Sequence, residues 1–320
     1  MSFSSEVKEE LSRINANSCC QRAELSALIR MAGTIRIIGG QSGVFLQIQT
    51  VHAPTARRIF KLLKIHFHKP TEIAIKRNNF LKDRSMYIIL LNLEDAKDLL
   101  TELGILDKDK EKITLQKGID HSILKKDCCK KAYLRGAFLG GGSISNPKGP
   151  YHMEYVTPDK ILAYDLKNLI NELGLNAKVV VRKNNYMVYL KEGNNISDML
   201  GNLGAHNSLF KFEDIRVLKG MRNSVNRLVN CETANINKTI GTSFRQIKAI
   251  KFLIDNNLFN NLPMNLKQIA EIRLDYPDLS LKELGQMLIP PLSKSGVSYR
   301  LKKIEQIAER EKLMKDNEGL

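Results

Sequence analysis

The sequence predicts an α+β fold in two parts, a body built from two copies of one helix-and-strand unit and an all-α domain at the C-terminal end. Three observations lead to this prediction. A cysteine-containing segment recurs along the chain, the apolar pattern after each copy follows the same order of helices and strands, and residues 243–320 show helical periodicity alone. Two such copies can pair about a pseudo-two-fold axis.

The repeat is clearest in two segments whose cysteine doublets begin at Cys19 and Cys128, 109 residues apart. At this offset CCQRAELSALIRMAGTI aligns with CCKKAYLRGAFLGGGSI, and the matched apolar positions keep the spacing of one helix face. We expect the two helices to pack closely across the axis, because small residues permit close approach of two backbones. These residues are Ser26, Ala27, Gly33, Gly136, Ala137 and Gly140.

The elements after each copy come in the same order, so that each unit reads αββαββα. In the first unit they are VFLQIQTV, APTARRIFKLLKIHF, TEIAIKR, SMYIILLNL and EDAKDLLTELGIL; in the second they are MEYVT, DKILAYDLKNLINELG, AKVVVRK, YMVYLKE and NISDMLGNLGAH. The expected domains are an N-terminal helix, two repeats, a basic linker helix with a hinge, and an all-α helix-turn-helix domain, over 1–18, 19–127, 128–214, 215–242 and 243–320.

The composition is that of a globular protein with an excess of positive charge. Apolar residues make up 43% of the chain, enough for real cores, and no apolar run approaches the ~18 residues of a membrane span. Fifty Lys and Arg against 34 Asp and Glu leave a formal net charge of +16. Such an excess favours a polyanionic partner through counterion release, although a Lys-rich proteome would produce the same total.

The expected linker begins with residues 215–230, which predict an amphipathic helix without an acid between Asp214 and Glu232. Its polar face is basic and includes Arg216, Lys219 and Arg227. This face is expected to lie beside phosphates, and a helix packed on the body by its apolar face fits the same pattern. The Asn- and Thr-rich stretch 235–242 is the expected hinge.

The last two helices carry the pattern of a helix-turn-helix. Ser280 and Glu283 form a capping box, and IPPLS interrupts the chain before the second helix. The inward positions of this second helix are Val297, Leu301 and Ile304. Its outward positions are Lys294, Ser295, Ser298, Tyr299, Lys302 and Lys303. In a recognition helix, early exposed residues reach base edges and later cations hold phosphates; Arg300 suits either task, and a plain helical bundle gives the same pattern.

The segments ELSALIRMAGTI and YLRGAFLGGGSI resemble the two copies of the LAGLIDADG motif, over residues 20 to about 215. In enzymes of that family an acid beside the last glycine of each motif holds metal ions over the scissile phosphates. Here Ala32 and Gly141 occupy those positions, and no Asp or Glu lies among residues 26–71 or 140–153. The resemblance therefore implies a LAGLIDADG-like body without catalytic residues, and we expect no enzyme activity.

The same resemblance implies a saddle of strands whose concave face lies on DNA in the enzymes. Basic residues of the expected strand hairpins could serve there, and solvated hairpin charges are the competing interpretation. They are Lys76, Arg77, Lys82, Arg84, Lys178, Arg182, Lys183 and Lys191.

Taken together, the CC doublet before a degenerate first motif, LRGAFLGGGSISNP as the second and NCETANINKT before the helix-turn-helix resemble the WhiA family along nearly the whole chain. The resemblance implies a nucleoid-associated transcriptional regulator linked to cell division, chromosome segregation or sporulation. Its implied partner is double-stranded DNA, with other transcription factors or RNA polymerase as further candidates.

Two other classes stay open on the residues alone. A divergent homing-type DNA endonuclease would cut duplex DNA in the presence of a divalent metal, whereas an RNA-binding maturase-like protein would prefer structured RNA. A pseudo-symmetric chain presents two equivalent surfaces without a partner, so we expect a monomer.

The five cysteines and the start of the chain bear on location and cofactors. An odd number of cysteines in two doublets plus Cys231 is a poor disulfide framework, and MSFSSEVKEELSRI reads as an amphipathic helix rather than a signal peptide. Both features favour the cytoplasm. The doublets, Cys19-Cys20 and Cys128-Cys129, lack zinc-ligand spacing, so we expect no metal and no cofactor. Packing is a more common role for such cysteines than redox sensing.

Overall fold

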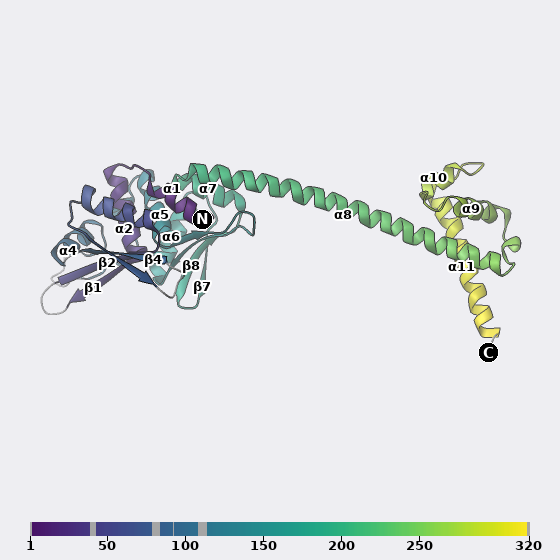
Figure 1. Cartoon of the computed structure of the whole chain (residues 1–320), viewed down its shortest axis with the longest axis horizontal. Helices are drawn as coiled ribbons and strands as arrows, with labels where there is room; N and C mark the ends of the chain where they lie inside the picture. The colour runs from purple at the N-terminus through teal and green to yellow at the C-terminus, as the bar shows by residue number, and fades with distance from the viewer. Residues whose placement is uncertain (1, 39–42, 79–83, 92, 108–113, 319–320) are drawn as a thin grey trace. The chain divides into compact units, whose positions relative to one another are not determined.

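The structure is a computed structural model that describes residues 2–38, 43–78, 84–91, 93–107 and 114–318 (Figure 1). The chain divides into two compact units, Met1–Gly220 and Met221–Leu320. The first is mixed helix and sheet and the second is helical, which confirms the predicted α+β class with an all-α C-terminal part.

The first unit contains both repeats. After an N-terminal helix α1 (Phe3–Ser12), the first repeat consists of α2 (Ser18–Ala32), β1 (Gly33–Ile38), β2 (Gly43–Thr50), α3 (Ala53–Lys61), a π-helical turn (Leu62–His66), β3 (Glu72–Asn78), β4 (Arg84–Leu91) and α4 (Leu93–Glu102). Its four strands form an antiparallel sheet in the order β1-β2-β4-β3.

The second repeat follows a short 3-10 helix (His121–Leu124) and has the same plan. It consists of α5 (Asp127–Gly141), β5 (Gly142–Ile144), β6 (Met153–Thr157), α6 (Lys160–Glu172), β7 (Lys178–Arg182), β8 (Asn185–Leu190) and α7 (Gly193–Leu203). The sheet order β5-β6-β8-β7 matches that of the first repeat. The predicted repeated αββαββα body is therefore confirmed.

Helices α2 and α5 pack directly against each other at the centre of this unit. Gly136 and Gly140 of α5 face α2: an added Cβ at Gly136 would collide with the Glu24 carbonyl oxygen, and one at Gly140 would lie 2.8 Å from Met31 Cβ. The expected close approach through small residues is thus confirmed for α5. Ser26 faces elsewhere, since its hydroxyl donates to the Leu103 carbonyl at 3.0 Å.

Each sheet buries one face beneath helices and leaves the other open. In β6 the side chains of Met153, Tyr155 and Thr157 are buried, whereas the alternate residues are half-buried. Leu46 and Ile48 of β2 are buried in the same way. This alternation follows from the two-residue period of a strand, and it leaves an outer face on both repeats.

The second unit is an all-α fold. It comprises the end of α8 (His206–Asp255), a 3-10 turn (Phe259–Asn261), α9 (Met264–Asp275), α10 (Leu281–Gln286) and α11 (Lys294–Glu318). The core contains Ile250, Leu253, Ile269, Leu284 and Leu301, all with no exposed surface. Buried Arg273 holds the α9–α10 connection by donating to the Pro277 and Leu279 carbonyls at 3.2 and 2.8 Å.

The predicted hinge at 235–242 is wrong, because this stretch is helical and lies within α8. Asn and Thr are weak helix formers, but their side chains can bond the backbone of the preceding turn. The hydroxyls of Thr239 and Thr242 donate to the carbonyls of Asn235 and Lys238, four residues back, at 2.9 and 2.8 Å. These side chains are therefore accommodated without interrupting the helix.

Candidate nucleic-acid interface

The helix-turn-helix consists of α10 and α11. The Ser280 hydroxyl accepts from the Glu283 amide while the Glu283 carboxylate accepts from the Ser280 amide, which confirms the predicted capping box. Gly285 lets the turn close on α10, because an added Cβ would meet the carbonyl oxygen of Leu292. The Ser293 hydroxyl accepts from the Gly296 amide at 3.3 Å, so a polar residue also opens α11.

The inward and outward sides of α11 lie as its periodicity predicts. Val297, Leu301 and Ile304 are buried in the core of the second unit. The six outward residues, Lys294, Ser295, Ser298, Tyr299, Lys302 and Lys303, are all exposed. Tyr299 keeps 68% of its surface exposed, a large fraction for an aromatic side chain. This part of α11 therefore presents three cations, two hydroxyls and a phenol to solvent.

Arg300 has a structural contact that the sequence did not reveal. Its side chain is half-buried and donates to the Asn265 carbonyl oxygen at 3.3 Å, which ties α11 to the start of α9. The hydroxyl of Ser295 also has a partner, since it lies 3.0 Å from that of Ser293.

Two of the three predicted linker cations contact the second repeat. Arg216 pairs with Glu213 at 3.0 Å and donates to the Asn194 side chain. Lys219 donates to the Gly149 carbonyl oxygen at 2.7 Å, and its ammonium lies 4.5 Å from the ring centroid of Tyr151. Both side chains are half-buried and secure the start of α8.

Beyond this anchor, α8 is exposed on all sides within residues 221–230. Arg227 is exposed, and its Nε donates to the Asn223 carbonyl at 3.3 Å. The predicted apolar face is exposed as well, with Val225 at 58% and Leu228 at 60%.

The β7–β8 hairpin places Arg182 and Lys183 at its tip. Arg182 is paired with Asn185, and the two residues between them form the turn, with Lys183 at φ +56°. Both basic side chains are exposed, as are Lys178, Lys191 and Lys76. The side chains of Arg77, Lys82 and Arg84 lie outside the described residues.

The positions expected to carry acids in a nuclease lie at the ends of α2 and α5. Ala32 is the last residue of α2 and Gly141 the last of α5. Gly141 is closely packed, since an added Cβ would lie 2.5 Å from Met31 Cε and 3.0 Å from the Val156 carbonyl oxygen. The fold therefore leaves little room for a carboxylate there.

A carboxylate near this end comes from the neighbouring strand of the second repeat. The register pairs Ser143 with Glu154, and the Glu154 carboxylate accepts from the Ser143 hydroxyl at 2.9 Å and contacts His152 Nε2 at 2.9 Å. The equivalent pair in the first repeat is Thr34 and Gln47. The carboxylate of Glu154 in the second repeat therefore corresponds to the uncharged amide of Gln47 in the first. A symmetric pair of acids is absent at these two positions.

A buried ion triad, which the sequence pattern did not reveal, joins the two repeats. Glu24 of α2 is fully buried and accepts two hydrogen bonds from Arg58 at 2.7 and 2.9 Å. It also accepts from Arg135 of α5 at 3.0 and 3.1 Å. The sequence signal that could have indicated this triad is an acid within an otherwise apolar helix face, together with arginines in two other predicted helices.

Comparisons with known proteins cover both units. Three family models match in succession: the WhiA N-terminal LAGLIDADG-like domain over residues 18–106, the WhiA LAGLIDADG-like domain over 130–222 and the WhiA C-terminal HTH domain over 225–308. Among the described residues no helix has the length and apolar character needed to cross a membrane.

Relatives match over almost their whole length. The chain is 48% identical over 314 residues to a probable cell division protein WhiA of Alkaliphilus metalliredigens, covering 98% of this chain and 99% of the relative. A protein of the same name from Clostridium botulinum is 50% identical over 311 residues, covering 97% and 98%. The crystal structure of full-length WhiA from Thermatoga maritima superposes with a TM-score of 0.59 at 27% identity, covering 97% of this chain and 99% of that one. With three family models and these relatives spanning both units, the chain belongs to the WhiA family.

Proposed function

We propose that this protein is a sequence-specific transcriptional regulator that binds double-stranded DNA through α11. The observation that carries the proposal is the outward face of α11, which exposes Lys294, Ser295, Ser298, Tyr299, Lys302 and Lys303 in a matched helix-turn-helix domain. Hydroxyl and phenol groups can hydrogen-bond base edges in the major groove, and lysines neutralise phosphates.

The six outward residues have different tasks in this proposal. Ser295, Ser298 and Tyr299 lie in the first two turns of α11, the part of a recognition helix that reaches bases. Lys302 and Lys303 follow one turn later and contact the phosphate backbone of the DNA. Arg300 supports this surface from behind through its bond to Asn265 rather than contacting DNA.

The body and α8 supply additional cationic contacts. Arg182 and Lys183 at the hairpin tip and Arg227 on α8 are exposed and suit phosphate binding. Arg216 and Lys219 are reassigned as anchors of α8, because both are already engaged with the second repeat.

The LAGLIDADG-like body binds without cutting in this proposal. Ala32 and Gly141 offer no metal ligand, and the position equivalent to Glu154 in the first repeat is Gln47 rather than a second acid. Two-metal cleavage of a phosphodiester requires carboxylates that hold both ions.

The cellular role follows from the family. Relatives are named probable cell division proteins, so we place this regulator in the control of cell division, with chromosome segregation or sporulation as associated processes. It would act as a monomer in the cytoplasm, on the nucleoid.

The test is retention of fragmented genomic DNA by the full chain at physiological salt with magnesium, followed by sequencing of the fragments and their ends. We expect a shared motif on uncut fragments.

Lys294→Glu with Lys302→Glu should weaken binding to a motif fragment roughly 100-fold, because two phosphate contacts become repulsive. The charge-matched control is Lys251→Glu with Lys312→Glu, two exposed lysines of the same unit that are not among the six outward residues.

Three results would contradict the proposal. Equal loss of binding in both double variants would make the effect one of net charge. Preference for structured RNA over duplex DNA at the same salt would favour the maturase-like class. New defined ends that require magnesium would show that the body is a nuclease.

A further inference from the structure

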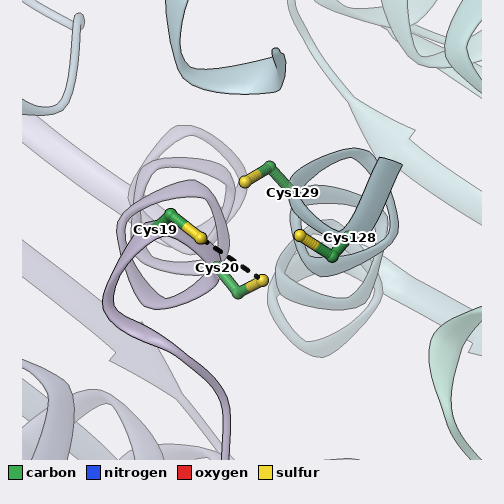
Figure 2. A group of neighbouring side chains, drawn as sticks. All are labelled: Cys19, Cys20, Cys128 and Cys129. Atoms are coloured by element: carbon green, nitrogen blue, oxygen red, sulfur yellow. Dashed lines mark hydrogen bonds between the residues drawn. The ribbon is translucent and has the colours of Figure 1, made fainter. Parts of the chain in front are cut away.

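Four cysteines that the sequence separates into two doublets lie together in the structure. Figure 2 shows their side chains directed toward one another, Cys19 and Cys20 from the first turn of α2 and Cys128 and Cys129 from the first turn of α5. Their Sγ atoms all lie within 4.8 Å of one another, and those of Cys19 and Cys20 are 4.0 Å apart. All four are free thiols.

This arrangement removes the reason for expecting no metal. That expectation depended on the ligand spacing within each doublet, whereas the pairing of α2 with α5 brings two ligands from each helix to one point. The doublets occupy equivalent positions of the two repeats, so the pseudo-two-fold relation of the helices produces a four-sulfur cluster.

The sulfur separations match a single tetrahedral ion. With Zn–S bonds of about 2.3 Å, the ligand sulfurs of a tetrahedral zinc site are about 3.8 Å apart. The observed separations, up to 4.8 Å, are at most about 1 Å longer than this. An iron–sulfur cluster inserts several irons and sulfides between its thiolates and needs a wider cage.

Partial and full positive charges lie close to these sulfurs. The cluster lies at the N-termini of two helices, whose dipoles stabilise anions. The N-cap residue of α2, Asn17, makes no side-chain hydrogen bond to its helix, whereas the first turn of α5 carries the carboxylate of Asp127. Lys125 and Lys126 line a surface pocket of about 400 Å³ that reaches Cys19 and Cys129. A second pocket reaches Cys20 and Cys128, so an ion has access from either side.

We propose that Cys19, Cys20, Cys128 and Cys129 bind one zinc ion with tetrahedral thiolate coordination. The ion would join the first turns of α2 and α5 and thereby link the two repeats. Its role is structural, because four protein ligands leave no open position for a substrate. Binding of one Zn²⁺ ion by four thiolates would release the four thiol protons to solvent and leave a net charge of about −2 on the site, which the two helix N-termini would offset.

The first measurement is the metal content of the full chain, purified under reducing conditions without chelator, followed by substitution with cobalt(II). We expect one zinc per chain and, in the cobalt form, the thiolate charge-transfer and strong ligand-field bands of a tetrahedral sulfur site. Cys20→Ser with Cys129→Ser should abolish both, whereas Cys231→Ser should leave both unchanged. Cys231 is the matched control, since it lies on α8 in the second unit and outside the cluster.

A measurement on the unaltered chain decides the matter if the double variant does not fold. Cys128 and Cys231 are both exposed, so both should react with a maleimide in the metal-free protein. With zinc bound, only Cys231 should react. Equal reactivity of the two cysteines in the presence of zinc would overturn the proposal, as would a chain without metal or one that carries iron with inorganic sulfide. These readouts do not involve DNA, so they are independent of the proposed function.

Discussion

The two ends of the α2/α5 helix pair differ in what the repeat places there. At the N-terminal end both copies carry cysteines, and four sulfurs meet. At the C-terminal end both copies lack an acid, with Ala32 on one helix and Gly141 on the other. One symmetric helix pair can thus hold a cluster of metal-binding groups at one end and close packing at the other. The symmetry of the helix pair therefore does not determine which chemical groups lie at either end.

The middle of the helix pair provides the largest expected effect. Glu24→Ala would leave Arg58 and Arg135 buried without their carboxylate, and breaking a buried pair in this way costs about 3–5 kcal/mol. Urea denaturation followed by circular dichroism measures the free energy of unfolding. The control is Glu102→Ala, which removes a largely exposed ion pair with Arg22 and should cost less than about 1 kcal/mol. Equal losses of unfolding free energy in the two variants would mean that the buried triad contributes no more stability than the exposed ion pair.

A buried lysine at the C-terminal end of α5 should make the stability of the protein depend on pH. Lys8 donates to the Leu139 carbonyl oxygen at 3.3 Å, and burial lowers the pKa of its ammonium from 10.5 to about 8. Between these values the unfolded chain binds more protons than the folded one, so the free energy of unfolding should rise with pH over that window. Relative to Lys8→Met, the wild type should gain up to about 3 kcal/mol from pH 8 to 10.5. A constant difference across this window would show that Lys8 stays charged in the fold.

Removal of metal should affect the N-terminal end of the helix pair. If zinc binds only the folded chain, saturation at 100 times the dissociation constant adds about 2.7 kcal/mol to stability. A strong chelator should therefore lower the thermal midpoint of the wild type and leave that of Cys20→Ser with Cys129→Ser unchanged. The same shift in both proteins would place the chelator's effect outside the cysteine cluster.

The contact between the helices predicts a smaller effect. Gly136→Ala inserts a methyl group against the Glu24 carbonyl of α2 and should cost about 1–3 kcal/mol through overpacking. Gly220→Ala is the matched control, because Gly220 lies in α8 with nothing within 4 Å of an added Cβ. That change should stabilise by about 0.5–1 kcal/mol, since Ala favours a helix. Thermal unfolding of both variants gives the comparison, and a neutral Gly136→Ala would contradict the close packing.

Much of the fold and the geometry of the helix-turn-helix could be predicted from local pattern. The capping box of Ser280 and Glu283 and the inward positions Val297, Leu301 and Ile304 depend on residues within one or two turns, and all are found as expected. The hinge failed because weak helix formers at Thr239 and Thr242 were taken as a break, whereas both side chains bond the helix backbone.

Local pattern did not show which side chains of the first part of α8 contact other segments. Arg216 and Lys219 share a basic helix face with Arg227, yet only Arg227 stays exposed, because Glu213, Asn194 and Gly149 engage the other two. Helical periodicity locates a face, but it does not show what lies against that face.

The order of elements, the internal repeat and the outward face of α11 follow from local periodicity, because each depends on residues close in sequence. The joining of Glu24 with two arginines and of Cys19 with Cys129 required the folded protein. These contacts link residues 34, 111 and 110 positions apart, and only the packing of α2 on α5 and α3 brings them together.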